Sequence, residues 1–287
     1  MHVPVMLDEC LEYLALKPDG VYLDSTAGLG GHVGAIARRL QAGGLVLACD
    51  RDLESLDRTR ENTADCADRI RYYKVSFSEL RELLRTEGIS QLDGLLSDLG
   101  VSKYQLTESE RGFSLMADGP LDMRQDRSQQ DTAADLVNFE SEKQLADLIY
   151  RLGEERRSRK IARAIVRARP IRTTGQLAKL IEQVVPRTGK LHPATQTFMA
   201  LRIAVNRELE ELDALLGSIP ELVKPGGRAV FLTFMSLEDR KVKQSFQAMA
   251  KDGRARILTR HVIRPSEREI AENPPSRSAK LRAIEIL

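Results

Sequence analysis

The chain has 287 residues, of which 42% are hydrophobic and 30% are charged, and its formal net charge is +2. This composition is typical of a globular protein and excludes a largely disordered chain. No run approaches the roughly 18 apolar residues that a membrane helix needs, and the first ten residues lack a signal-peptide pattern. We therefore expect a cytoplasmic protein with no membrane partner. Three cysteines without metal-binding spacing predict free thiols and no metal.

Residues 21–98 alternate short apolar runs with helical stretches. The apolar runs read VYLDS, LVLACD, IRYYKV and DGLLSDLG. This alternation predicts an α/β fold with a parallel sheet. Three of the runs carry an acid at the end, namely Asp24, Asp50 and Asp98. These carboxylates should gather at the carboxyl edge of the sheet, where open α/β sheets bind their ligands.

The strand and helix rhythm stops after about residue 105, where the sequence becomes polar and helical. We predict a helical insertion over residues 106–197, within a sheet domain formed by residues 1–105 and 198–287. Apolar positions from Phe198 to Leu212 recur at helical spacing, which predicts helical structure there. The run RAVFLTF then resumes the sheet, and RARILTRHVI with AKLRAIEIL predicts an antiparallel hairpin at its edge.

A glycine-rich loop, DSTAGLGGH, connects the first predicted strand to a helix. Its glycines let the backbone approach a ligand, which indicates a nucleotide-like cofactor. The dinucleotide fingerprint fails, because Val33 stands where a small residue is required. Asp50 follows Gly30 by 20 residues, where a carboxylate can accept ribose hydroxyls, and Asp24 can face a cationic amino group. Together these residues favour S-adenosylmethionine (AdoMet) over NAD.

Residues 151–172 hold nine basic residues and two acids. Ile161, Ala162, Ile165 and Val166 form an apolar stripe at helical spacing beneath this basic face. The basic face is either a solvated helix surface or a surface that binds nucleic-acid phosphates.

Seven motifs occur in a fixed order: HVPVML, GGH, SDLGVS, GEERRSRKIARAI, HPATQTFMALRIAVN, SLEDRKVK and NPPSRSAKLR. With these motifs the whole chain resembles the MraW family of bacterial methyltransferases. The resemblance implies a class I (Rossmann-like) AdoMet methyltransferase sheet interrupted by a helical domain that helps to hold RNA. It also implies methylation of the exocyclic N4 of a cytidine in the decoding region of small-subunit (16S) ribosomal RNA, in the 30S subunit.

The resemblance also assigns AdoMet contacts, residue by residue. They are Gly30, Gly31, His32, Asp50, Phe77, Asp98 and Gln105. Phe77 either borders the adenine or is a core aromatic residue. Asp98 either accepts a proton from the cytosine N4 or only orients the cofactor. Asn206 and Ser236 are weaker candidates for binding the base edge, and His192 is expected to be structural.

Two groups of basic residues are candidates for contacts with RNA phosphates. They are Arg156, Arg157, Arg159, Lys160 and Arg163 in the insertion, and Arg277, Lys280 and Arg282 near the end of the chain.

The chain departs from the usual family pattern at Lys103, Tyr104, Met199 and Met235. Met235 stands where a histidine is common. Two alternatives to the ribosomal RNA methyltransferase therefore stay open: a methyltransferase for another acceptor, and a ribosome-assembly factor that binds RNA and AdoMet without turnover. The oligomeric state also stays open, with a homodimer as one alternative.

Overall fold

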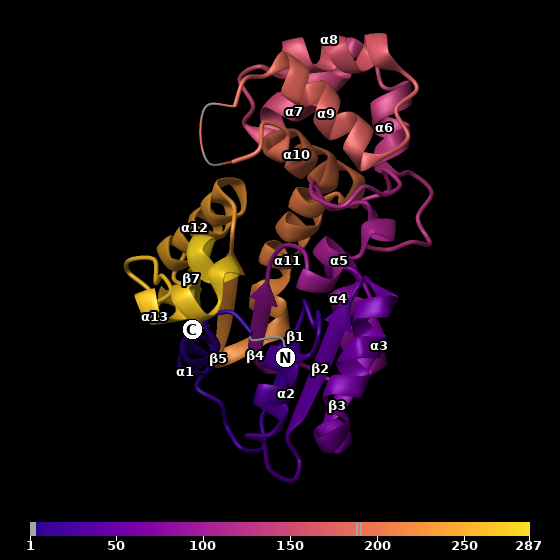
Figure 1. The fold of residues 1–287 in the computed structure, drawn as a ribbon. Helices are drawn as coiled ribbons and strands as arrows, with labels where there is room; N and C mark the ends of the chain where they lie inside the picture. The colour runs from indigo at the N-terminus through magenta and orange to yellow at the C-terminus, as the bar shows by residue number, and fades with distance from the viewer. Residues whose placement is uncertain (1–3, 188, 190) are drawn as a thin grey trace. The chain divides into compact units, whose positions relative to one another are not determined.

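The computed structural model describes residues 4–187, 189 and 191–287. The chain divides into two compact units, one formed by Met1–Gly100 with Leu209–Leu287 and the other by Val101–Glu208 (Figure 1). His2 and Val3 of the HVPVML motif lie outside the described residues. No helix in the described part is long and apolar enough to cross a membrane.

The first unit contains a seven-stranded sheet in the order β3-β2-β1-β4-β5-β7-β6. The strands are β1 (Val21–Asp24), β2 (Leu45–Asp50), β3 (Ile70–Lys74), β4 (Leu92–Asp98), β5 (Val223–Thr233), β6 (Ala255–Ile257) and β7 (Lys280–Ile286). The first five pair in parallel, and β7 is antiparallel to both β5 and β6. This arrangement confirms the predicted class I α/β sheet and its antiparallel edge pair. The strand order reverses at β1 and β4, so the crevice for a ligand is expected beyond their carboxyl ends.

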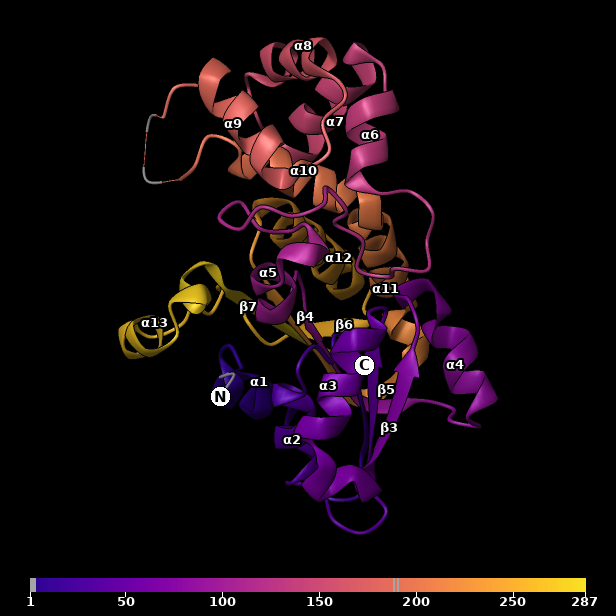
Figure 2. The same ribbon diagram turned by 45° about the vertical axis from the view of Figure 1, so that its right-hand side comes forward.

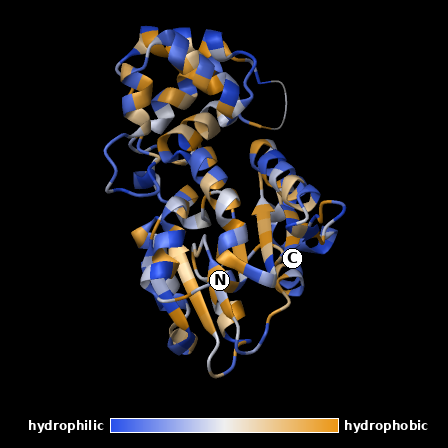
Figure 3. Cartoon of the chain, turned by 180° about the vertical axis from the view of Figure 1, so that it is seen from behind, coloured by the Kyte–Doolittle hydropathy of each residue, from blue (hydrophilic) through white to orange (hydrophobic). Residues whose placement is uncertain are grey.

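Helices cover both faces of this sheet. They are α1 (Leu7–Leu14), α2 (Gly31–Ala37), α3 (Leu53–Asn62), α4 (Leu80–Thr86), α11 (Glu208–Leu222) and α12 (Ser236–Lys251). A further helix of this unit, α13 (Glu267–Glu272), lies between β6 and β7 in the chain and buries none of its residues. Neighbouring strand residues point to opposite faces: Leu95 packs with α4, α11 and α12, whereas Leu96 packs with α1, α2 and α3. The central strands are accordingly mostly hydrophobic, and the helices alternate apolar and polar faces (Figure 3).

The second unit is helical. It contains α5 (Lys103–Thr107), α6 (Ala133–Phe139), α7 (Glu142–Gly153), α8 (Ser158–Ala168), α9 (Thr174–Val184) and α10 (Thr195–Asn206). Helices α6 to α10 surround one apolar core, with α7 packed against α8 and α10 (Figure 2). Ile161, Ala162 and Ile165 of the predicted stripe are fully buried in this core. The amphipathic helix that the sequence predicts is therefore present as α8.

The predicted helical segment from Phe198 to Leu212 is divided between two helices, α10 and α11. Arg207 has a φ of 48°, in the left-handed region, which ends α10 before α11 begins. Phe198 and Leu201 of α10 pack into the helical core. The boundary between the units consequently falls after Glu208, not before Phe198, and the earlier boundary falls after Gly100.

Candidate functional site

Three acidic side chains lie at the carboxyl edge of the sheet. Strands β1, β2 and β4 end at Asp24, Asp50 and Asp98, and β1 lies between the other two strands. Asp24 pairs with Ala48 and Leu96, so Asp50 and Asp98 lie two residues further along the strands on either side of it. The sequence pattern alone was sufficient to expect this gathering.

Thr26 connects two of these acids. Its backbone N–H donates to Asp24 Oδ1 at 3.0 Å, and its hydroxyl donates to the same oxygen at 3.3 Å. The hydroxyl also accepts from the backbone N–H of Asp98 at 2.6 Å. Sequence analysis did not identify Thr26, because its role depends on the neighbouring strand. The loop is thereby fixed so that Asp24 and Asp98 share one small space.

Two carboxylate oxygens in this space lack a partner. Asp24 Oδ2 and Asp98 Oδ1 are buried and accept no hydrogen bond from any part of the chain that the structure describes. Asp24 is 1% exposed, whereas the Asp98 side chain keeps an exposed fraction of 23%, so solvent reaches one edge of it. A buried carboxylate oxygen without a donor is costly unless a ligand supplies one.

The pKa values of Asp24 and Asp98 are raised, which also indicates that burial disfavours their ionised forms. Burial raises the pKa of Asp24 to about 7; the hydrogen bonds from Thr26 lower it, and the Asp50 carboxylate opposes them. Burial, with repulsion from Asp24 and Glu238, raises the pKa of Asp98 to about 8. A cation placed among these carboxylates would favour their ionised forms. A positively charged ligand would therefore lower the cost of ionising both acids.

Asp50 holds the glycine-rich loop. Its Oδ2 accepts from the backbone N–H of Gly28 at 2.9 Å, and its Oδ1 accepts from that of Asp52 at 2.9 Å. A carboxylate offers about four acceptor positions, so each oxygen can still accept a hydroxyl. Gly28 and Gly30 have φ values of 54° and 83°, a left-handed conformation that disfavours other residues. Both bends are needed to turn the chain from β1 into α2.

The His32 side chain lies inside the protein, and both of its ring nitrogens face protein groups. It is 5% exposed, and its Nε2 lies 3.0 Å from the carbonyl oxygen of Val5. Its Nδ1 faces Asp98 Oδ2 at 3.9 Å. The histidine therefore joins the N-terminal segment to the acidic site from inside the protein.

Two other predicted site residues, Phe77 and Ser236, come just after strands β3 and β5 of the same sheet. Phe77 is partly buried and packs against the core, which favours the core-aromatic alternative. Ser236 begins α12 just beyond the carboxyl end of β5. Two residues on, the buried Glu238 accepts from the backbone N–H groups of Phe234 and Met235 at 3.1 and 3.2 Å. Glu238, which sequence analysis missed, thus orders the turn that carries Ser236 and Met235.

Gln105 and Asn206 belong to the helical unit. Gln105 Oε1 accepts from the backbone N–H of Ser102 and completes a capping box at the start of α5. Asn206 is fully buried; its Oδ1 accepts from Gln125 N at 2.7 Å, and its Nδ2 donates to Met123 O at 2.7 Å. An amide committed in this way holds the backbone, so Asn206 is placed as a structural residue.

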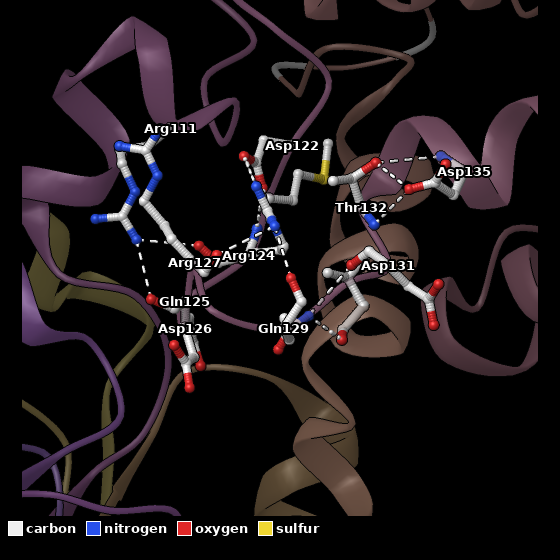
Figure 4. A network of polar contacts seen from close by, with 12 residues as sticks. Arg111, Asp122, Arg124, Gln125, Asp126, Arg127, Gln129, Asp131, Thr132 and Asp135 are labelled. Carbon is white, nitrogen blue, oxygen red and sulfur yellow. Dashed lines mark hydrogen bonds and ion pairs between the residues drawn. The ribbon is translucent and has the colours of Figure 1, made fainter.

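The loop that Asn206 holds is part of a larger polar network (Figure 4). The buried Arg111 donates to the carbonyl oxygens of Arg124 and Gln125. Arg124 in turn forms two hydrogen bonds with the carboxylate of Asp122, at 2.7 and 2.9 Å. These contacts fix an irregular segment that has no regular secondary structure to satisfy its carbonyl groups.

Replacing Asn206 by Ala is therefore expected to destabilise the protein by about 3 kcal/mol, because buried backbone groups of Met123 and Gln125 lose their partners. Thermal unfolding measured by calorimetry tests this value. The exposed Gln130, replaced by Ala, is the control and should change the midpoint little. An equal midpoint for both variants would show that the Asn206 contacts contribute nothing.

The predicted RNA-binding residues divide into two classes. Arg156, Arg157, Arg159, Lys160 and Arg163 are all exposed, and of these Arg163 pairs with Glu142. Near the end of the chain Arg277 is exposed, but Arg282 and Lys280 pair with Asp239 at 2.7 and 3.5 Å. These last two cations are therefore occupied within the protein, which weakens their assignment as phosphate contacts.

No cluster of His, Cys, Asp or Glu side chains within the described residues is arranged to hold a metal ion. Cys10, Cys49 and Cys66 are free and buried.

Comparison with known proteins identifies the family. The model of the MraW methylase family matches residues 1–287. This chain belongs to the MraW methylase family.

Two similar proteins carry the same name. A relative from Solibacter usitatus, a ribosomal RNA small subunit methyltransferase H, is 59% identical over 286 residues, and the match covers 100% of both chains. The relative of the same name from Syntrophobacter fumaroxidans is 47% identical, covering 99% of this chain and 96% of its own length. A solved rRNA methylase from Streptococcus thermophilus aligns with 100% of this chain and 99% of its own, at 10% identity and a TM-score of 0.48. Membership in this family makes the protein a methyltransferase.

Proposed function

We propose that this MraW methylase transfers a methyl group from AdoMet to the exocyclic N4 of a cytidine in small-subunit ribosomal RNA, in the cytoplasm. The observation that carries the donor part is the pair of buried carboxylate oxygens without partners, Asp24 Oδ2 and Asp98 Oδ1. The names of the relatives support ribosomal RNA as the acceptor.

The residues present fit AdoMet. When bound, AdoMet supplies an electrophilic methyl group on a positively charged sulfur. Asp24 and Asp98 offer carboxylate oxygens to its cationic groups, and Asp50 offers its remaining acceptor positions to ribose hydroxyls. The bends at Gly28 and Gly30 let the backbone come close to the ligand.

Asp98 would also act on the acceptor. The N4 lone pair of cytosine is delocalised into the ring, so a group that accepts an N4 proton makes the nitrogen more nucleophilic. The Asp98 side chain has an exposed edge from which it could accept this proton, and a bound cation would keep its carboxylate ionised for that role. A cytidine in a loop or a single strand would be the easier target, because a stacked base must first leave its helix.

The exposed cations before and along α8 would bind the phosphates of the RNA. Arg156, Arg159 and Lys160 are exposed, and the apolar stripe behind them anchors the helix in its own core. Such contacts supply affinity that falls as the salt concentration rises. The second face of the same helix is buried, so these residues can be changed without disturbing the core.

The acceptor is tested by incubating the protein with methyl-labelled AdoMet and 30S subunits from cells that lack the modification. The RNA is then digested to nucleosides and separated. Label in N4-methylcytidine would support the proposal. Label in another nucleoside, or in protein, would replace the acceptor, and binding of AdoMet without any transfer would instead support an assembly factor.

Affinity for AdoMet should depend on pH. The pKa of Asp98 lies at about 8 in the free protein, and only the ionised carboxylate attracts a cation. Affinity should therefore be highest above about pH 8 and fall by up to about tenfold per pH unit below it. S-adenosylhomocysteine, which lacks the sulfonium charge, should show a weaker dependence in the same calorimetric titration. Identical pH profiles for both ligands would contradict the carboxylate assignment.

A further inference from the structure

The N-terminal segment Pro4–Met6 lies directly on the glycine-rich loop of the donor site. A Cβ atom built on Gly31 would lie only 3.0 Å from the Cβ of Pro4, so the Pro4 ring packs closely against the Gly31 backbone. Val5 and Met6 are 8% and 1% exposed, respectively. The segment is therefore a packed part of the site and not a loose end.

The same segment sets the orientation of His32. The Val5 carbonyl can only accept a hydrogen bond, so Nε2 of His32 must be the donor across their 3.0 Å contact. Fixing the proton on Nε2 leaves Nδ1 as the nitrogen that faces Asp98 Oδ2, 3.9 Å away. The position of Val5 therefore determines which ring nitrogen of His32 points toward the Asp98 carboxyl group.

The segment is itself held from a distant part of the chain. Met6 has a φ of 50°, a left-handed conformation that costs about 1 kcal/mol or more for a residue with a side chain. Its backbone N–H donates to Glu269 Oε1 of α13 at 2.7 Å. Glu269 therefore supplies a compensating contact at the residue next to Val5.

We propose that Glu269 is a positioning residue for methyl transfer, which fastens the Val5–Met6 segment so that His32 presents Nδ1 to Asp98. This inference rests on the proposed function. It is a chain of three contacts, from Glu269 to Met6, from Val5 to His32 and from His32 to Asp98. Glu269 itself touches neither the cofactor loop nor Asp98 in any of these contacts.

The electrostatic setting of Glu269 supports a specific role. Burial raises its pKa; the Met6 hydrogen bond lowers it, and the nearby acids Glu9 and Asp8 raise it further. A carboxylate among other acids is unfavourable for the fold, so its hydrogen bond to Met6 is the contact that offsets this cost. Glutamine could accept the same bond without the charge, whereas alanine could not.

The first test reads the imidazole directly in the ligand-free protein. The chain has four histidines, so nitrogen-15 spectra of the imidazoles can be assigned with a His32→Asn variant. We expect wild type and Glu269→Gln to share one His32 signal with a hydrogen-bonded Nε2–H, and Glu269→Ala to lose it. An unchanged His32 signal in Glu269→Ala would overturn the proposal.

The second test is a double-mutant cycle on methyl transfer. Glu269→Ala should lower kcat/KM about tenfold in wild type but less than twofold in a His32→Asn background, because its effect passes through His32. Glu269→Gln should restore most of the rate, and Glu267→Ala, an exposed acid on the same helix, should change nothing. Equal losses in both backgrounds would mean that Glu269 acts through general stability, and would overturn the inference. A wild-type protein that binds no AdoMet would instead refute the proposed function.

Discussion

Replacing Asp98 by Asn is expected to lower methyl transfer at least a thousandfold and, at the same time, to stabilise the ligand-free protein. The loss follows from removing both a carboxylate from the donor site and the proton acceptor for N4. The gain follows from the raised pKa of about 8, which shows that the fold disfavours the ionised carboxyl. Since the unfolded chain ionises this group near its ordinary value, its cost to stability grows as pH rises from about 4 to 8.

A rise of about four pKa units, at about 1.4 kcal/mol each, gives an expected stabilisation of up to about 5 kcal/mol at pH 8, or roughly 10 °C or more in Tm. The stabilisation should shrink at pH 5. Asp65→Asn is the matched control, because Arg38 lowers the pKa of that exposed carboxyl and its removal should not stabilise the protein. A variant at Asp98 that is less stable than wild type at pH 8 would show that the carboxylate is satisfied in the free protein.

Neutralising the basic face next to α8 is expected to separate RNA binding from cofactor binding. Changing Arg156, Arg159 and Lys160 together to Gln should weaken RNA binding about a hundredfold at moderate salt, because three phosphate contacts are lost. Affinity for AdoMet should stay the same, since its carboxylates lie in the other unit.

The salt dependence of binding makes this test specific. The slope of log affinity against log salt should decrease in magnitude by roughly two to three for the triple variant. Changing Lys251, Arg254 and Arg268 to Gln removes the same charge from exposed positions of the sheet unit and serves as the control. Equal losses in both triple variants would mean that net charge, not the α8 face, governs RNA binding.

The strand-end acids were readable from the sequence because each follows a buried apolar run and parallel strands share one edge. The role of Thr26 could not be predicted, because its partner Asp98 comes from another strand. Glu238 accepts from backbone groups of its own turn, three and four residues earlier, but the Met at the N-cap position hid the usual capping signal. Lys280 and Arg282 appeared as free cations in the sequence, yet Asp239, some forty residues earlier, pairs with both. Pairings of this kind depend on tertiary contacts that periodicity does not encode.

The break between α10 and α11 was harder to predict than their helical periodicity. The apolar spacing continues from Phe198 to Leu212, but Arg207 turns left-handed and divides the segment between two cores. Arginine carries no local signal for such a conformation, which glycine or asparagine would. The contact from Met6 to Glu269 is likewise invisible in the sequence, because 263 residues separate the two.

The donor site at the strand ends is tested most directly by calorimetric titration of AdoMet into wild type and an Asp50→Ala variant at pH 8. We expect wild type to bind one AdoMet per chain and the variant to bind at least tenfold more weakly, because the ribose loses its acceptor and the loop loses the Gly28 contact. Equal affinity in the two proteins, or no binding to wild type, would contradict the assignment of this edge as the donor site.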